Sequence, residues 1–229
     1  MARELAWDDI ADRRESWPVT RHEVLARGNV SSFVVDTVQT PDGGSMTRQY
    51  LLHPGAVGVI AWDDADRIAV VLQYRHPVAH TLMEPPAGLL DQDGEDPLLA
   101  VQRELAEEAG LAATDWRVLV DLFTTPGGNQ ESVRVYLARQ LSEAPAPEGF
   151  VADSEEAHME IAWAPRAQVV SAVLAGRVQN PVLVAGVMAL ETARLGGRLP
   201  ELRPADAPWP ARDAWAAQNR ELNDVGNPG

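Results

Sequence analysis

Three glutamates fall within five consecutive residues of the chain, and their spacing suggests a particular chemistry. Glu104, Glu107 and Glu108 stand in the run RELAEEAGL, residues 103–111. Positions three and four apart on a helix are neighbours, so Glu104 would project beside both of the others. Crowded carboxylates repel each other unless a cation lies among them. Mg²⁺ and Mn²⁺ prefer such oxygen ligands, so the cluster is a candidate metal site. The alternative interpretation of the three glutamates is a solvated acidic helix face.

The residues around the cluster predict the helix that must carry it. Pro97 suits the first helical turn, Asp96 before it is a candidate N-cap, and Gly110 is placed to end the helix. Apolar side chains would occupy the face opposite the glutamates: Leu98, Val101 and Leu105. The helix therefore has one side to bury and one side to hold a metal.

The segment from Gly88 to Leu111 resembles the signature of the Nudix hydrolases. That signature is Gly, five residues, Glu, seven residues, Arg-Glu, an aliphatic residue, any residue, Glu-Glu, any residue, Gly and an aliphatic residue. From Glu95 onward the match is complete, but six residues rather than five separate Gly88 from Glu95. An extra residue in a Gly/Asp-rich loop costs little. The resemblance, weaker over 45–195, implies an α/β/α sandwich with a mixed β-sheet.

Hydrophobic and β-branched runs predict the other elements. Residues 30–38 and 47–52 are expected to form a hairpin around the turn at 41–44, and residues 3–15 a short charged helix. Residues 84–90 are expected to be a strand end that feeds a loop. Further strands are expected at 56–62, 67–74, 116–123, 133–140 and 160–164, and further helices at 165–175 and 181–195. This order fits the implied sandwich.

Three stretches resemble the ADP-ribose pyrophosphatase branch of the family, in its actinobacterial form. They are MEPPAG, which contains Glu84; PGGNQE, which contains Gly127 and Glu131; and QYR, which ends at Arg75. The resemblance implies that these four residues bind substrate. Each stretch also has an ordinary explanation, because a Pro-Gly sequence makes a turn in any fold and an exposed arginine usually pairs with a surface carboxylate.

The implied activity is Mg²⁺-dependent (or Mn²⁺-dependent) hydrolysis of the diphosphate of ADP-ribose to AMP and ribose 5-phosphate. One alternative is a Nudix pyrophosphatase for another nucleoside-diphosphate derivative, such as a nucleotide sugar, NADH or FAD. The other is a non-catalytic nucleotide-sensing Nudix domain. The complete set of signature carboxylates argues against a sensor, since sensors commonly lose them.

The resemblance also assigns roles around the diphosphate. Glu104 and Glu108 are the first expected metal ligands, Glu107 is a bridging or second ligand, and the backbone carbonyl of Ala87 could complete the set. Arg103 is four residues before Glu107 and is expected to hold that carboxylate in place rather than to touch substrate.

In the resembled branch the general base is a glutamate on a loop after the later strands, and the resemblance implies that the acidic stretch 153–159 supplies it here. By its placement relative to Trp163, Glu156 is favoured, Glu155 is second and Glu107 is the next candidate. His158 stands where the family usually has an acidic residue, so the choice between the two adjacent glutamates stays open. A merely solvated acidic loop is the alternative.

The chain is expected to divide into three parts. Residues 1–55 form an N-terminal β-rich segment, 56–195 the Nudix hydrolase domain, and 196–229 a C-terminal extension of unknown role. In the resembled branch, N-terminal strands exchange within a homodimer. The resemblance therefore implies a homodimer in which Arg48 reaches the partner's site and contacts the ADP-ribose.

Bulk composition restricts the class of partner. The 229 residues include 19 basic and 34 acidic side chains, a formal charge of −15, which argues against nucleic acid or an anionic membrane as partner. The absence of cysteine excludes disulfides and a thiolate nucleophile. No apolar run approaches the roughly 18–20 residues that span a bilayer, and the charged N-terminus is unlike a secretory signal. We therefore expect a cytoplasmic enzyme with a small nucleoside-diphosphate substrate.

Overall fold

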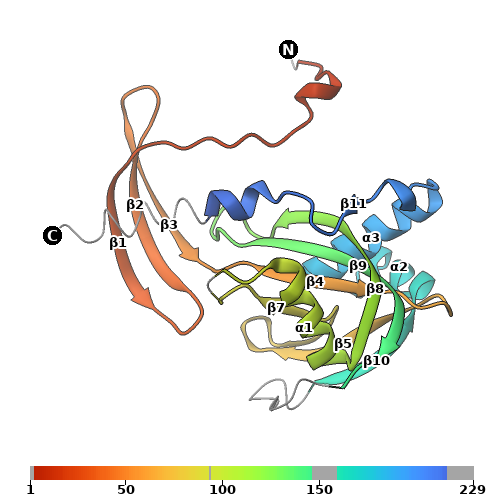
Figure 1. Cartoon of the computed structure of the whole chain (residues 1–229). Coiled ribbons are helices and arrows are strands. Elements are labelled where there is room, and N and C mark those ends of the chain that lie inside the picture. Colours follow the sequence, from red (N-terminus) through yellow and green to blue (C-terminus); the bar gives the residue numbers. More distant parts are fainter. Residues whose placement is uncertain (1–2, 93, 146–158, 216–229) are drawn as a thin grey trace. The chain divides into compact units, whose positions relative to one another are not determined.

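The computed structural model describes residues 3–92, 94–145 and 159–215 (Figure 1). The chain forms two compact units. The N-terminal unit contains the residues up to Leu52 together with the segment that begins at Pro210. The second unit, His53–Trp209, contains the predicted helix with the glutamates, and we refer to it as the catalytic unit.

The N-terminal unit is built on a three-stranded antiparallel sheet in the order β1-β2-β3. Its strands are β1 (Val19–Arg27), β2 (Ser32–Gln39) and β3 (Ser45–Leu52). The last two form the expected hairpin, whereas β1 was not predicted. The expected helix at 3–15 is wrong, because this stretch contains only one 3-10 turn, Trp7–Asp9. A short helix needs packing to be stable, and the apolar residues here are exposed: Leu5, Trp7 and Ile10.

A buried hydrogen-bonded cluster links the three strands of this sheet. The carboxylate of Asp36 on β2 lies 2.6 Å from Nδ1 of His22 on β1 and accepts a hydrogen bond of 2.7 Å from the hydroxyl of Tyr50 on β3. Burial, and then the adjacent Asp36, raises the pKa of Tyr50. The side chains of His22 and Asp36 are both buried, so their mutual contact compensates for the loss of hydration.

The described residues of the catalytic unit form two sheets. The larger has the order β11-β8-β9-β4-β7, in which only β4 and β9 are parallel, and the smaller has the antiparallel order β10-β5-β6. The strands are β4 (Ala56–Ala61), β5 (Arg67–Arg75), β6 (His80–Glu84), β7 (Ala87–Leu89), β8 (Leu111–Phe123), β9 (Ser132–Glu143), β10 (Glu160–Pro165) and β11 (Arg203–Pro204). Short 3-10 turns occur at His76–Val78 and Leu199–Glu201.

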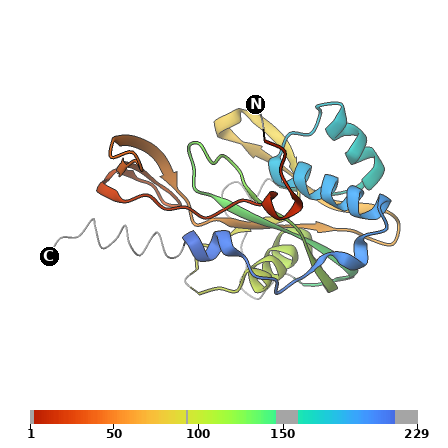
Figure 2. The ribbon, with the colours of Figure 1, turned by 90° about the horizontal axis from the view of Figure 1, so that it is seen from above.

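Helices cover both faces of the larger sheet, which gives the expected α/β/α sandwich. Figure 2 shows α1 (Pro97–Ala109) on one side and α2 (Arg166–Leu174) and α3 (Pro181–Leu195) on the other. The main hydrophobic core lies between α3 and the sheet. At Gly186 of α3 a Cβ atom would lie 2.8 Å from the side chain of Ile60 on β4, so glycine lets this helix approach the sheet closely.

The structure differs from the predicted strands in two places. The expected strand end at 84–90 is two separate strands, β6 and β7. The strand expected at 116–123 begins at Leu111 instead, because Gly110 has φ of 64° and turns the chain directly from α1 into β8. Within the described ranges, the helices all fall short of the length and apolar character needed to cross a membrane.

Candidate active site

Helix α1 forms as its sequence predicts. The side chain of Asp96 accepts hydrogen bonds from the N–H groups of Leu98 and Leu99, at 2.8 and 3.2 Å. Gly110 ends the helix, and its N–H donates to the carbonyl of Ala106. Three residues of the inner face are buried: Ala100, Val101 and Leu105. The caps fix where the helix starts and the apolar face fixes its rotation, so the glutamates are held on the side facing β7.

Strand β7 lies directly against two of the three glutamates. The backbone N–H of Ala87 donates to Oε2 of Glu108 at 2.9 Å. A Cβ atom on Gly88 would lie only 2.0 Å from Oε1 of Glu104. Only glycine leaves room for this carboxylate. The backbone of β7 and the carboxylates of α1 therefore form one cradle.

Arg103 lies among the carboxylates of the signature. Its Nη1 is 2.8 Å from Oε1 of Glu104 and 2.9 Å from Oε2 of Glu107, and its Nε is 3.3 Å from Oε1 of Glu95. The contact with Glu107 is the one expected from the spacing. Sequence reasoning missed those with Glu104 and Glu95, although Glu95 belongs to the signature. Partial burial opposes protonation, but these carboxylates outweigh it and raise the pKa of Arg103.

The donor types of this cradle fit a hard divalent cation, because they are carboxylate oxygens on adjacent turns of one helix. Among residues 3–92, 94–145 and 159–215, no three His, Asp or Glu side chains are already arranged around a common metal position. In this conformation the guanidinium of Arg103 supplies the positive charge between Glu104 and Glu107.

Two of the predicted substrate residues pair with each other. Arg75 at the end of β5 donates from Nε and Nη2 to the two carboxylate oxygens of Glu84 at the end of β6, at 3.0 and 2.7 Å. Glu84 is buried, whereas the side chain of Arg75 is 42% exposed. This two-point contact fixes the plane of the guanidinium. Glu84 therefore orients Arg75 just before the chain enters β7, whose backbone contacts Glu108.

The other two predicted substrate residues lie in the loop at 124–131, between β8 and β9. Gly127 is exposed at the turn. Glu131 accepts a hydrogen bond from the hydroxyl of Thr124, and its other oxygen lies 3.3 Å from Nδ1 of His53. No sequence pattern indicated the His53 contact. Both oxygens of Glu131 are engaged in holding the loop.

Two groups of predicted residues cannot be placed at this site. Arg48 belongs to the N-terminal unit, where its Nη1 donates to the carbonyl of Thr47 at 2.9 Å. Its contact with a partner's site stays a prediction. The base candidates Glu155 and Glu156, with His158, lie outside the described residues.

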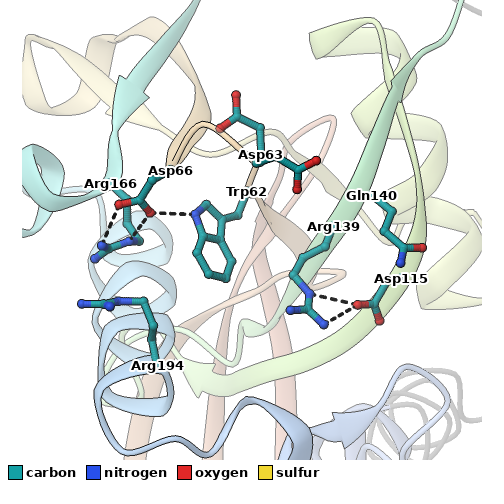
Figure 3. Close-up of a pocket in the computed structure, with 9 residues that line it drawn as sticks. Trp62, Asp63, Asp66, Asp115, Arg139, Gln140, Arg166 and Arg194 are labelled. Carbon is teal, nitrogen blue, oxygen red and sulfur yellow. Dashed lines mark hydrogen bonds and ion pairs between the residues drawn. The ribbon is translucent and has the colours of Figure 1, made fainter.

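A separate polar pocket of about 580 Å³ lies at the far end of β4 (Figure 3). β4 pairs with β7 at its first residues and leads at its other end into Trp62, which lines the pocket. The pocket's three arginines are paired with carboxylates: Arg139 with Asp115, Arg166 with Asp66 and Glu191, and Arg194 with Glu191. Because all three arginines of this pocket are paired and none of the signature carboxylates lines it, the α1–β7 cradle is the better candidate site.

Comparison with known proteins identifies the family. Residues 52–184 match the NUDIX domain. The chain belongs to the Nudix hydrolase family. It is 46% identical over 200 residues to an ADP-ribose pyrophosphatase of Mycobacterium tuberculosis, a match that covers 87% of this chain and 94% of that protein.

Two further matches indicate how widely the fold is used. A methanol dehydrogenase activator from Bacillus methanolicus is 39% identical over 121 residues, which are 53% of this chain and 65% of that protein. The crystal structure of an ADP compounds hydrolase superposes with a TM-score of 0.66 at 20% identity, covering 82% of this chain and all of that one. At this identity the structural match supports the Nudix fold alone.

Proposed function

We propose that this Nudix hydrolase cleaves the diphosphate of ADP-ribose to AMP and ribose 5-phosphate, with Mg²⁺ or Mn²⁺ as cofactor. The main support is the 46% identity to the mycobacterial ADP-ribose pyrophosphatase, which extends over 94% of that protein. A match of 200 of the 229 residues reaches into the N-terminal segment as well as the signature. The cradle of α1 and β7 supplies the carboxylates that such a reaction requires.

The cradle residues have separate roles in this proposal. Glu104 and Glu108 would hold the metal, with Glu107 and the carbonyl of Ala87 as further ligands. The metal would neutralise the negative oxygens of the diphosphate, so that water can approach. Arg103 keeps Glu107 in place through its contact of 2.9 Å, and so acts as a positioning residue.

The substrate itself would be bound by residues outside the signature. Arg75, oriented by Glu84, presents its exposed side to a phosphate group. The loop at 124–131, with Gly127 and Glu131, would face the rest of the ADP-ribose. Arg48 would come from the partner in a homodimer, and sedimentation of the purified protein would test that assembly. A cytoplasmic location remains a prediction from the composition.

A general base removes a proton from the attacking water in this scheme. We favour Glu156 for this role, with Glu155 second and Glu107 next. Ligand carboxylates make poor bases because their lone pairs are engaged, which is why a glutamate from a separate loop is preferred. The proton would pass from water to one carboxylate oxygen.

A substrate panel tests the proposed function. The protein is incubated with Mg²⁺ and ADP-ribose, NADH, FAD, sugar nucleotides or nucleoside triphosphates, and the products are quantified. ADP-ribose should have the highest kcat/KM and should yield AMP. If another substrate proved about tenfold better, equivalent to about 1.4 kcal/mol of transition-state stabilisation, the ADP-ribose assignment would be abandoned and the Nudix family assignment kept.

A further inference from the structure

A short C-terminal segment crosses the edge of the large sheet in the catalytic unit. This segment, Arg203–Trp209, is here named the C-terminal strap. It begins as β11, which pairs with β8 at Val118. Leu199 and Leu202, just before it, pack on the hydrophobic core. The strap ends at Trp209, which is 6% exposed, so this part of the sequence extension is firmly packed on the catalytic unit.

The strap covers the place where the β8–β9 ladder is interrupted. A register shift separates Val118 from Val120 on β8. Beyond this bulge only four residue pairs lead to the loop at 124–131, from Val120–Val135 to Phe123–Ser132. Bulges and edge strands are local weak points of a sheet. The loop is therefore carried on a short stretch of ladder, which β4 supports on the β9 side, at Val133 and Arg134, and the strap supports on the β8 side, where Arg203 donates to Asp121.

One buried arginine joins the strap to both strands of this stretch. Arg134 on β9 donates to both oxygens of Asp121, its opposite residue on β8, at 2.8 and 3.0 Å. It also donates to the strap carbonyls of Ala207 and Pro208, at 2.6 and 2.9 Å. The ring of Trp209 lies 4.8 Å from its guanidinium carbon. A buried charge is tolerated only with such partners, so β8, β9 and the strap are held as one assembly.

We propose that the C-terminal strap positions the loop at 124–131 for substrate binding, with Arg134 as the positioning residue. Arg134 lies in the second of the last four pairs of the β8–β9 ladder, so two pairs, Leu122–Val133 and Phe123–Ser132, connect it to the loop. At the loop itself, Glu131 is held by Thr124 and His53. The proposal rests on the proposed function, because that function makes the loop part of the substrate site.

Hydrogen exchange on the full-length protein tests the proposal without any substrate. The N–H groups of Gly128 and Asn129 both bond to the carbonyl of Thr125. In Arg134→Lys, which cannot make the same multiple contacts, these amides should exchange about tenfold faster because the loop opens more often. Unchanged exchange in Arg134→Lys would overturn the proposal.

The chain offers a matched control in Arg166, at the start of α2. This arginine is also buried and also makes a two-point contact with an aspartate, Asp66. Arg166→Lys should lower thermal stability as Arg134→Lys does, but should leave the exchange of Gly128 and Asn129 unchanged. Equal acceleration in both variants would mean general loosening and would reject a specific role for the strap.

Steady-state kinetics separate this proposal from the proposed function. For whichever nucleoside diphosphate the unaltered enzyme cleaves best, Arg134→Lys and Trp209→Ala should raise KM about tenfold and leave kcat within about twofold, since loop position affects binding more than the chemical step. If another nucleoside diphosphate is cleaved in place of ADP-ribose, and both the exchange and the KM for that substrate change as expected, the strap proposal stands and the ADP-ribose assignment falls. If ADP-ribose is cleaved and the KM of Arg134→Lys equals that of Arg166→Lys, the strap proposal is wrong.

Discussion

At the scale of single residues, the three glutamates of α1 have different surroundings. Glu108 accepts a hydrogen bond from the backbone of β7. Glu104 lies against Gly88 and contacts Arg103, and Glu107 contacts Arg103 as well. Glu108 thus accepts a hydrogen bond from the backbone of another element, whereas the other two both contact Arg103. Glu108 therefore links α1 directly to β7, and its charge is the first to test.

The first prediction concerns that charge. Glu108→Gln keeps the shape of the side chain and an acceptor for the Ala87 N–H, but removes the negative charge. We expect normal folding and a loss of kcat of about 10²-fold or more, because stabilisation of developing charge is worth several kcal/mol. Circular dichroism and steady-state assays with Mg²⁺ measure the two effects. Glu143→Gln, at the exposed end of β9, is the control, and near-normal turnover of Glu108→Gln would remove Glu108 from the site.

The second prediction concerns the general base. Glu156→Gln should lower kcat by about 10²-fold or more and leave KM and metal affinity nearly unchanged, because a base acts on the water rather than on ground-state binding. Glu155→Gln should have a much smaller effect. The measurement is the pair of single variants at saturating Mg²⁺. A larger loss of kcat in Glu155→Gln would make Glu155 the general base in place of Glu156. If neither variant lost kcat, Glu107 would become the next candidate for the base.

At the scale of elements, the distance between α1 and β7 is set by the absence of a side chain at Gly88. A Cβ atom there would overlap the carboxylate of Glu104. Gly186 allows a similar close approach between α3 and β4, where its Cβ would meet Ile60. Each glycine thus brings a helix onto a strand, but only the first does so at the cradle.

The third prediction uses these two glycines as a matched pair. Gly88→Ala should displace Glu104 and reduce kcat by about tenfold or more, since displacement of a catalytic group by about 1 Å is expensive in rate. Gly186→Ala should lower stability by about 1–3 kcal/mol through overpacking and leave the activity of the folded fraction unchanged. Thermal unfolding measures the stability of both variants, and steady-state assays measure their kcat. Full activity in Gly88→Ala would contradict a cradle in which Gly88 makes room for Glu104.

At the scale of the whole catalytic unit, one network joins segments far apart in the chain. Arg166 at the start of α2 donates to Asp66, in the turn before β5, and to Glu191 on α3. The hydrogen bond from Arg166 is the main cause of the lowered pKa of Asp66, and that from Arg194 of the lowered pKa of Glu191. Both pKa values lie below those of the unfolded chain.

The fourth prediction is the pH dependence of this network. Because the pKa values are lowered by folding, the stabilisation is present above the ordinary values of 3.8 for Asp66 and 4.5 for Glu191, and it is lost as the pH falls through the lowered values. The free energy of unfolding of the unaltered protein should fall below about pH 4.5. Arg166→Gln should be less stable at pH 7 and show a shallower fall in acid. Urea titrations from pH 7 to 3 measure the free energy of unfolding of both proteins. If it falls with pH at the same slope in both, the contacts of Arg166 are excluded as the cause.

The fifth prediction concerns the homodimer. If Arg48 acts in the partner's site, Arg48→Ala and Glu108→Gln subunits are each inactive alone but complement each other. Random mixing makes about half of the dimers mixed, with one complete site each, so about a quarter of the normal activity should return. Subunits are unfolded, mixed, refolded and assayed, with each variant refolded alone as control. Absence of recovery in verified mixed dimers would place Arg48 elsewhere.

The sequence by itself determined the features that depend on neighbouring residues. The spacing of the three glutamates, the Asp96 cap and the closing Gly110 each act within one or two turns of α1, so local rules were sufficient. Local rules failed for residues 3–15, where a short charged helix was expected. No partner for its apolar residues follows from the local sequence, and in the structure they are exposed.

Only the tertiary structure decided which distant groups meet. Glu108 accepts a hydrogen bond from the backbone of Ala87, and Arg75 donates to Glu84. Arg134 donates to carbonyl groups of the C-terminal strap. These partners are separated by 21, 9 and 73 residues. Their contacts arise from strand register and from the packing of helix on sheet, and neither is encoded in the residues adjacent to them. The chemistry could therefore be predicted from the sequence, whereas the arrangement that orients it required the fold.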